Sequence, residues 1–221
     1  MKRIYEAAAY GPQGACYWAD TVPPMDWPRL PGPRHSAIAI IGGGFTGISA
    51  ALHLAQDGHE VTLLEAGHPG YGASGRNGGF CCLGGAKAGA GLIRRQLGEE
   101  GLAEWLVTEK AAVDTAARLI RDHDIDADTH SNGETLLAHT PRAYRGLCAD
   151  AASAPADYGV TPHLTPPDKL LDEGLGGSFH GALTLPIGFA LNPRKYHAGL
   201  ARAAQQAGAA LHAHTPVTAL R

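Results

Sequence analysis

The stretch from Ala37 to Glu65 restricts the fold more than any other part of the chain. It opens with a short apolar run, Ala37–Ile41, that passes into three glycines, and it closes with a second apolar run, Val61–Leu64. Runs of this kind are typical of strands buried on both faces of a parallel sheet. Between them, apolar residues recur at three- and four-residue spacing (Ile48, Ala51, Leu52 and Ala55), which predicts a helix that ends near Gly58. Strand, turn, helix and strand together predict a βαβ unit and an α/β fold.

The turn after the first strand carries the pattern G-x-G-x-x-G at Gly42, Gly44 and Gly47. A first glycine allows the tight turn, a second lets the backbone approach a pyrophosphate, and a third lets helix and strand pack closely. Phe45 and Thr46 open the helix, whose free N–H groups favour a phosphate at that end. We therefore predict that all five residues contact a cofactor.

Glu65 stands at the end of the second predicted strand, where a carboxylate can accept hydrogen bonds from ribose hydroxyls. Its negative charge disfavours a 2′-phosphate at the same place. The pattern thus predicts an adenine dinucleotide site, although the turn alone does not distinguish NAD from FAD. The alternative is a glycine-rich turn that binds nothing.

Composition excludes several classes of protein. The 221 residues include 18 Lys and Arg against 21 Asp and Glu, a formal charge of −3 that does not favour nucleic-acid binding. No apolar stretch is long enough to span a membrane, and the first residues lack the apolar core of a signal peptide. Four cysteines are too few for a disulfide framework, so we expect Cys81 and Cys82 to be thiols and the protein to be cytoplasmic. His212 and His214 are expected to face solvent in a strand, and no metal site is predicted.

A second glycine-dense segment runs from Gly70 to Phe80, with the sequence Gly-Tyr-Gly-Ala-Ser-Gly-Arg-Asn-Gly-Gly-Phe. Together with the turn and Glu65, it resembles the D-amino-acid-oxidase-like flavoprotein superfamily, and in particular its amine oxidases of the gamma-glutamylputrescine oxidase type. Tyr17–Asp20, Asn192–Tyr196 and Thr215–Val217 resemble further segments of that group.

The resemblance implies that the cofactor is FAD and that this second segment runs beneath the flavin. The cofactor-binding residues implied there are Ala73, Ser74, Gly75, Arg76, Asn77, Gly78 and Gly79, and the backbone of Val217 is implied to meet the adenine. Ser74, Arg76 and Asn77 offer a hydroxyl, a fixed charge and an amide for the polar edges of such a cofactor. Cys81 and Cys82 follow this segment, and simple packing is favoured over covalent attachment of the flavin through them.

The activity implied by the resemblance is oxidation of the C–N bond of an amine or amino acid. A hydride passes to the flavin, the imine hydrolyses, and dioxygen reoxidises the flavin with release of hydrogen peroxide. Two other functions stay open from the residues alone: an NAD-dependent dehydrogenase, and a non-catalytic remnant or subunit that binds a dinucleotide or a partner chain. No catalytic residue is assigned.

The expected fold is a Rossmann-like FAD-binding βαβ domain with an inserted α+β substrate domain. We divide the chain into an extended leader (1–35), the βαβ core with the flavin segment (36–90), a partial substrate domain (91–190) and a return to the cofactor domain (191–221). Further elements are expected at Leu92–His123 (helical, broken by Gly98 and Gly101), 134–139 (strand), 142–153 and Pro193–Ala207 (helices), and Ala210–Ala213 and Val217–Leu220 (strands).

Because family members run to roughly twice this length, the resemblance also implies that both domains are incomplete. The chain is then a fragment or a truncated reading frame. Self-association, or a second polypeptide that completes the fold, stays open.

Overall fold

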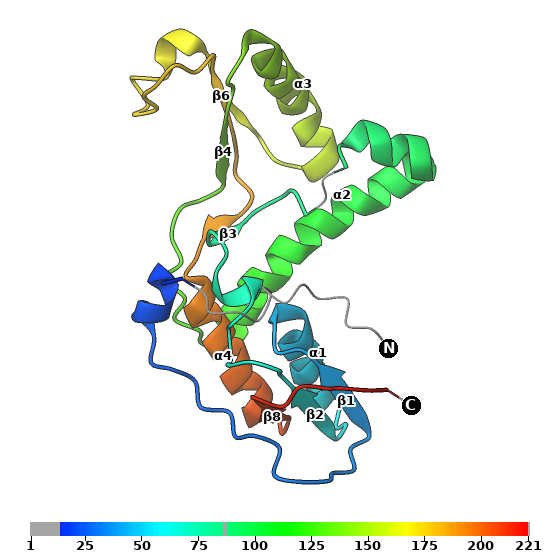
Figure 1. Ribbon diagram of the computed structural model, residues 1–221. Coiled ribbons are helices and arrows are strands. Elements are labelled where there is room, and N and C mark those ends of the chain that lie inside the picture. Colours follow the sequence, from blue (N-terminus) through cyan, green and yellow to red (C-terminus); the bar gives the residue numbers. More distant parts are fainter. Residues whose placement is uncertain (1–13, 86–87, 221) are drawn as a thin grey trace. The chain divides into compact units, whose positions relative to one another are not determined.

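The computed structural model describes residues 14–85 and 88–220, and it divides them into two compact units (Figure 1). The first unit holds described residues 14–79, 119–129 and 191–220, and the second holds 80–85, 88–118 and 130–190. Residues 119–129, which the sequence analysis assigned to the substrate domain, thus cluster with the first unit. The expectations for residues 1–13 lie outside the described residues.

A three-stranded parallel sheet forms the centre of the first unit. Its strands are β1 (Ile38–Ile41), β2 (Val61–Leu64) and β8 (Ala210–His212), in the order β1-β2-β8, with Ile38 opposite Val61 and Leu63 opposite Leu211. Helix α1 (Phe45–Gln56) connects β1 to β2, and α4 (Pro193–Gln206) leads into β8. The two helices pack against each other (Figure 1). The predicted βαβ unit is confirmed.

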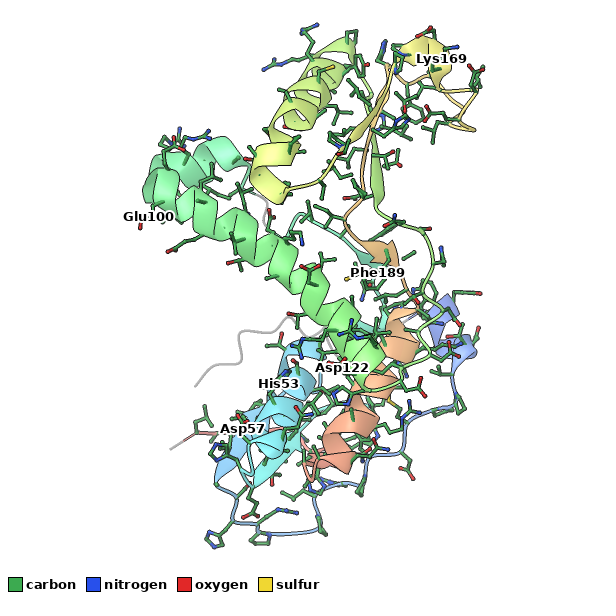
Figure 2. All side chains as sticks on the ribbon, turned by 180° about the vertical axis from the view of Figure 1, so that it is seen from behind. His53, Asp57, Glu100, Asp122, Lys169 and Phe189 are labelled. Atoms are coloured by element: carbon green, nitrogen blue, oxygen red, sulfur yellow. The ribbon has the colours of Figure 1, made fainter. Side chains whose placement is uncertain are left out.

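The residues of α1 explain its position. Ile48, Ala51, Leu52 and Ala55, the predicted apolar stripe, are its buried residues. Asp57 caps the helix, and Gly58 follows at φ +84°, a conformation that favours glycine and turns the chain towards β2. Figure 2 shows His53 and Asp57 at this end of the helix.

Strand β1 differs from the prediction that it is buried on both faces. Its residues alternate between half-buried and exposed, and the Ile41 side chain is 54 % exposed. The reason is its place in the sheet, since among the described residues β1 pairs with β2 alone. The prediction holds for β2, where Val61 and Leu63 on one face and Thr62 on the other are at most 4 % exposed.

The described part of the leader is not extended throughout. Tyr17–Thr21 form a 3-10 helix, η2, and the Trp18 indole donates a hydrogen bond to the Asn77 carbonyl. Further on, Trp27 is 4 % exposed and belongs to the core of the first unit.

The second unit combines an antiparallel sheet with two helices. Strands β4 (Glu134–Leu137), β6 (Ala182–Leu185) and β5 (His163–Thr165) pair in the order β4-β6-β5, and α3 (Pro141–Tyr158) packs on β5 and β6. A short pair joins β3 (Phe80–Cys81) to β7 (Phe189–Ala190), and η4 (Pro167–Lys169) follows β5. Figure 2 marks Phe189 in β7 and Lys169 in η4.

Helix α2 (Ala90–Asp122) belongs to the second unit up to Arg118. Gly98 interrupts it with φ 77° and ψ −175°, whereas the helix continues through Gly101. The predicted break is thus confirmed at Gly98 and wrong at Gly101. No helix in the described part of the chain is both long enough and apolar enough to cross a membrane.

The strand predicted at Val217–Leu220 does not form. Thr215 instead donates its amide to the Glu65 carbonyl, and His214 donates to the Gly67 carbonyl. These bonds hold His214 and Thr215 beside the segment that follows β2. The residues after them therefore leave the sheet and do not form another strand.

Candidate cofactor site

The turn between β1 and α1 has the geometry that its glycines predict. Gly42 adopts φ +102° and donates its amide to the Leu64 carbonyl, 2.8 Å away. A Cβ on Gly47 would lie 2.0 Å from the Gly42 carbonyl oxygen, so no larger residue fits there without movement of the turn. Gly44 is the N-cap of α1. The turn therefore brings bare backbone to the N-terminus of this helix.

Glu65 is held against the turn by two backbone amides. Its Oε2 accepts from Gly43 N–H at 2.8 Å, and its Oε1 accepts from Gly67 N–H at 2.7 Å. Each carboxylate oxygen can accept a second hydrogen bond. The predicted ribose acceptor is thus fixed in orientation and retains acceptor capacity.

The second glycine-dense segment meets the turn through Ser74. This residue lies in a 3-10 turn, η3 (Ala73–Gly75), and its hydroxyl oxygen accepts from the Phe45 amide at 3.0 Å. The hydroxyl proton stays available as a donor. Thr46 is exposed, and the amides of Thr46 and Gly47 have no hydrogen-bond partner among residues 14–85 and 88–220. Two motifs predicted separately therefore meet at one helix end that carries unsatisfied donors.

Asn77 uses its side chain to shape its own loop. Its Nδ2 donates to the carbonyls of Ala73 (3.1 Å) and Ser74 (3.3 Å), while its Oδ1 accepts from Gly79 N–H at 2.9 Å. Gly75 and Gly79 are buried, whereas Arg76 and Gly78 are exposed. Arg76 reaches the Gly14 carbonyl at 3.5 Å. The loop thus has internal bonds that the sequence analysis did not predict.

His197 supports the turn from α4. It is completely buried, its Nε2 donates to the Gly43 carbonyl at 2.6 Å, and its Nδ1 has no hydrogen-bond partner among the described residues. The Trp27 ring stacks on it with centroids 6.1 Å apart, and the Phe45 ring lies at 6.0 Å. Burial lowers the pKa of His197, which keeps the ring neutral. The sequence analysis missed this role, since nothing local to α4 marks its contact with the turn.

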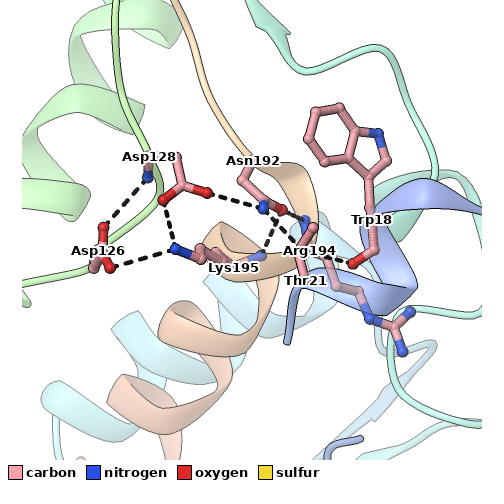
Figure 3. A network of polar contacts seen from close by, with 7 residues as sticks. All are labelled: Trp18, Thr21, Asp126, Asp128, Asn192, Arg194 and Lys195. Atoms are coloured by element: carbon pink, nitrogen blue, oxygen red, sulfur yellow. Dashed lines mark hydrogen bonds and ion pairs between the residues drawn. The ribbon is translucent and has the colours of Figure 1, made fainter. Parts of the chain in front are cut away.

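Asn192 organises the start of α4 (Figure 3). Its Oδ1 accepts from the amides of Arg194 and Lys195, both at 3.1 Å, and its Nδ2 donates to Thr21 Oγ1 and Asp128 Oδ2. Lys195 in turn forms ion pairs with Asp126 and Asp128. The predicted helix start at Pro193 is confirmed, and Asn192 is its buried N-cap.

Arg194, on the first turn of α4, points to the loop after β2. Only 8 % of the residue is exposed, and Nη1 donates to the Gly70 carbonyl at 2.7 Å. Its buried Nε has no hydrogen-bond partner in the part of the chain that the structure describes.

Four other residues named from the sequence remain: Val217, His212, Cys81 and Cys82. Val217 is half-buried, two residues after the Thr215 amide that binds the Glu65 carbonyl. His212 is 7 % exposed with Nδ1 3.1 Å from the Pro28 carbonyl, so the prediction that it faces solvent is wrong. Cys81 and Cys82 are free thiols. Within the described ranges no group of three or more His, Cys, Asp or Glu side chains is arranged to hold a metal ion.

The chemistry of these groups fits a dinucleotide. The unsatisfied amides of α1 and the buried guanidinium of Arg194 suit a diphosphate, and the fixed carboxylate of Glu65 suits a ribose.

The chain is similar to known proteins along most of its length. The family model described as "FAD dependent oxidoreductase" (DAO) matches residues 37–221. The chain is 33 % identical over 206 residues to "Probable oxidoreductase OrdL" of Rhizobium meliloti (strain 1021), a match that covers 91 % of this chain and 47 % of the relative. It is 60 % identical over 42 residues to "Gamma-glutamylputrescine oxidoreductase" of Escherichia coli (strain K12), covering 19 % of this chain and 10 % of the relative.

Among solved structures, glycine oxidase from Geobacillus kaustophilus matches with a TM-score of 0.63 and 25 % identity, over 82 % of this chain and 47 % of that one. The chain matches these relatives along most of its own length. It spans only about half of theirs.

Proposed function

Because the chain belongs to the DAO family of FAD-dependent oxidoreductases, we propose that it binds FAD at the β1–α1 turn and takes part in oxidation of an amine or amino acid. The observation that carries the proposal is the hydrogen bond between Ser74 Oγ and the Phe45 amide. This bond joins the phosphate-binding turn to the glycine-dense loop. A turn that binds a dinucleotide does not by itself require such a loop beside it.

The residues have separate roles in holding the cofactor. The amides of Thr46 and Gly47, at the positive end of α1, bind the diphosphate, and the Ser74 hydroxyl donates to it. Glu65 accepts from the ribose hydroxyls through the lone pairs that Gly43 and Gly67 leave open. The backbone of Ala73–Gly79 approaches the flavin, with Asn77 bracing that loop, and Val217 approaches the adenine.

Bound FAD would supply a two-electron acceptor for a hydride from the carbon that bears the substrate nitrogen; water would hydrolyse the resulting imine, and dioxygen would take up the two electrons to give hydrogen peroxide. The chain's own contribution is to fix the dinucleotide and to exclude water beneath it, by packing Trp27, His197 and Phe45 behind the turn. The proposed substrate is a small amine or amino acid, the class that the names of the relatives point to: gamma-glutamylputrescine for the Escherichia coli protein and glycine for the Geobacillus kaustophilus protein.

The test is a titration of the purified chain with FAD and, separately, with NAD. We expect saturable, stoichiometric binding of FAD, with a change in the visible flavin spectrum and a rise in the melting temperature, and no such rise with NAD. Gly44→Val places a side chain where Ser74 Oγ lies 3.0 Å from the added Cβ, and it should abolish the effect of FAD. Stabilisation by NAD but not by FAD would overturn the proposal.

Substrate oxidation is tested on the FAD-loaded chain without oxygen. We expect a panel of primary amines, secondary amines and amino acids to include compounds that bleach the flavin absorbance. Binding of FAD without bleaching by any of them would support the alternative of a chain that binds a dinucleotide and does not catalyse.

A further inference from the structure

Arg194 occupies an unusual position under the glycine-dense loop. Its guanidinium lies close to two glycines: a Cβ on Gly70 would be 2.4 Å from Nη1, and a Cβ on Gly75 would be 3.0 Å from it. The residue is more than nine-tenths buried, and its Nη1 bond to the Gly70 carbonyl anchors the start of the loop that carries Ser74.

The charge of Arg194 lacks a counter-charge. Among residues 14–85 and 88–220 no carboxylate forms an ion pair with it, and its buried Nε has no hydrogen-bond partner. Burial lowers the pKa of Arg194, with Cys16 as a smaller opposing influence. A buried, unpaired guanidinium is strongly unfavourable unless an anion neutralises it.

Arg194 is linked to the phosphate-binding turn through His197 on the same helix and through the loop that it anchors. Burial is the main cause that lowers the pKa of His197, the charge of Arg194 lowers it further, and His197 is bonded to Gly43 of the turn. The loop that Arg194 anchors meets the amide of Phe45 through Ser74. The guanidinium therefore adds positive potential to the part of the turn that His197 contacts, and it anchors the loop that meets α1.

We propose that Arg194 sets the affinity for the cofactor, because its unpaired buried guanidinium supplies positive charge that the diphosphate of the dinucleotide neutralises. Arg194 acts by its charge across the turn, without contact to the cofactor, and is therefore a positioning residue. The inference rests on the proposed function, in that it takes FAD as the dinucleotide. The competing explanation is that Arg194 only braces Gly70 and that its charge has no part in binding.

The experiment compares three variants with the wild-type chain. Arg194→Met removes the charge, Arg194→Lys keeps the charge without the planar guanidinium, and Arg202→Met removes an exposed charge on the same helix. Each protein is melted alone, with FAD, and with inorganic diphosphate, and the FAD dissociation constant is measured at low and high salt.

If charge is the important property, Arg194→Met binds FAD at least about ten-fold more weakly and loses the stabilisation by inorganic diphosphate. Arg194→Lys keeps most of both effects, and Arg202→Met behaves as the wild type. The salt dependence of FAD binding decreases in Arg194→Met. Without ligand, Arg194→Met melts no lower than the wild type, because an uncompensated buried charge has been removed.

Equal FAD affinity in Arg194→Met and the wild type overturns the inference, as does equal weakening in the Lys and Met variants. If Arg194→Met does not fold, Arg194→Gln replaces it as the neutral variant. If the wild type binds inorganic diphosphate through Arg194 but not FAD, the proposed function fails and the inference about the anion holds. A wild-type chain that neither ligand stabilises overturns both.

Discussion

The Nε2 atom of His197 lies 2.6 Å from the carbonyl oxygen of Gly43, so a helix late in the chain supports the glycine-rich turn between β1 and α1 near its start. The bond is completely buried and is covered by the stacked ring of Trp27. The bond fixes the carbonyl of Gly43, and the amide of Gly43 donates to the Glu65 carboxylate.

His197→Ala should therefore destabilise the chain by about 2–4 kcal/mol, because it leaves both a cavity and an unpaired buried carbonyl. Urea unfolding followed by circular dichroism measures the loss. The matched control is His53→Ala on α1, a half-buried ring bonded only to the Ser49 carbonyl of its own helix. A loss at His197 no larger than at His53 would contradict a supporting role.

Acid should lower the stability of the folded chain by protonating the His197 ring. The pKa of His197 is lower in the folded chain than in the unfolded chain, so between the two values the unfolded state binds more protons. The stabilising contribution is present above the ordinary value of 6.5 and is lost as the pH falls below it. Melting temperatures between about pH 7.5 and about pH 5 should decline more steeply for the wild type than for His197→Gln. Parallel curves would show that His197 does not titrate differently on folding.

Gly47→Ala should be disruptive although alanine is a better helix former. Its Cβ would lie 2.0 Å from the Gly42 carbonyl oxygen, and relief requires movement of the turn, at a cost of about 1–3 kcal/mol or more. Gly146→Ala in α3 meets nothing within 4 Å and should stabilise by about 0.5–1 kcal/mol. Thermal unfolding of the two variants should shift in opposite directions, and a neutral Gly47→Ala would mean that the turn is softer than its geometry indicates.

Cys82 should be a slow nucleophile. Burial, with Glu134 as the next cause, raises its pKa from 9.0 to about 11, which lowers the thiolate fraction about 100-fold at neutral pH. In a Cys81→Ser background, alkylation of Cys82 by iodoacetamide, followed by mass spectrometry, should be slower than that of a simple thiol by a similar factor. Glu134→Gln should recover part of the rate. Alkylation as fast as that of a free thiol would refute the prediction.

Local pattern was sufficient for the elements around the turn. The apolar runs of β1 and β2, the stripe of α1 and the start of α4 at Pro193 depend on neighbouring residues, so their periodicity and terminal residues can be read from the sequence. Three of the corrections share a different cause. Edge exposure of β1, burial of His212 and the missing strand at Val217–Leu220 depend on which distant segment lies alongside, and periodicity carries no information about that.

The same distinction applies to the candidate site. Gly42, Gly47 and Glu65 follow from a motif with a known spacing, and Ser74 follows from the resemblance of its loop. Trp27, Arg194 and His197 were missed, since a tryptophan in a leader and two basic residues on a helix have no local pattern that marks a buried role. Only the hydrogen bonds to Gly43 and Gly70 and the ring stacking assign them.

The bond between His197 and Gly43 also has a kinetic consequence, since it joins residues 154 positions apart. The βαβ turn is a local structure that can form early, but its support arrives only after the ends of that large loop have met. Competence to bind the dinucleotide should thus appear late in folding, and the ligand would select chains in which this long-range closure is complete.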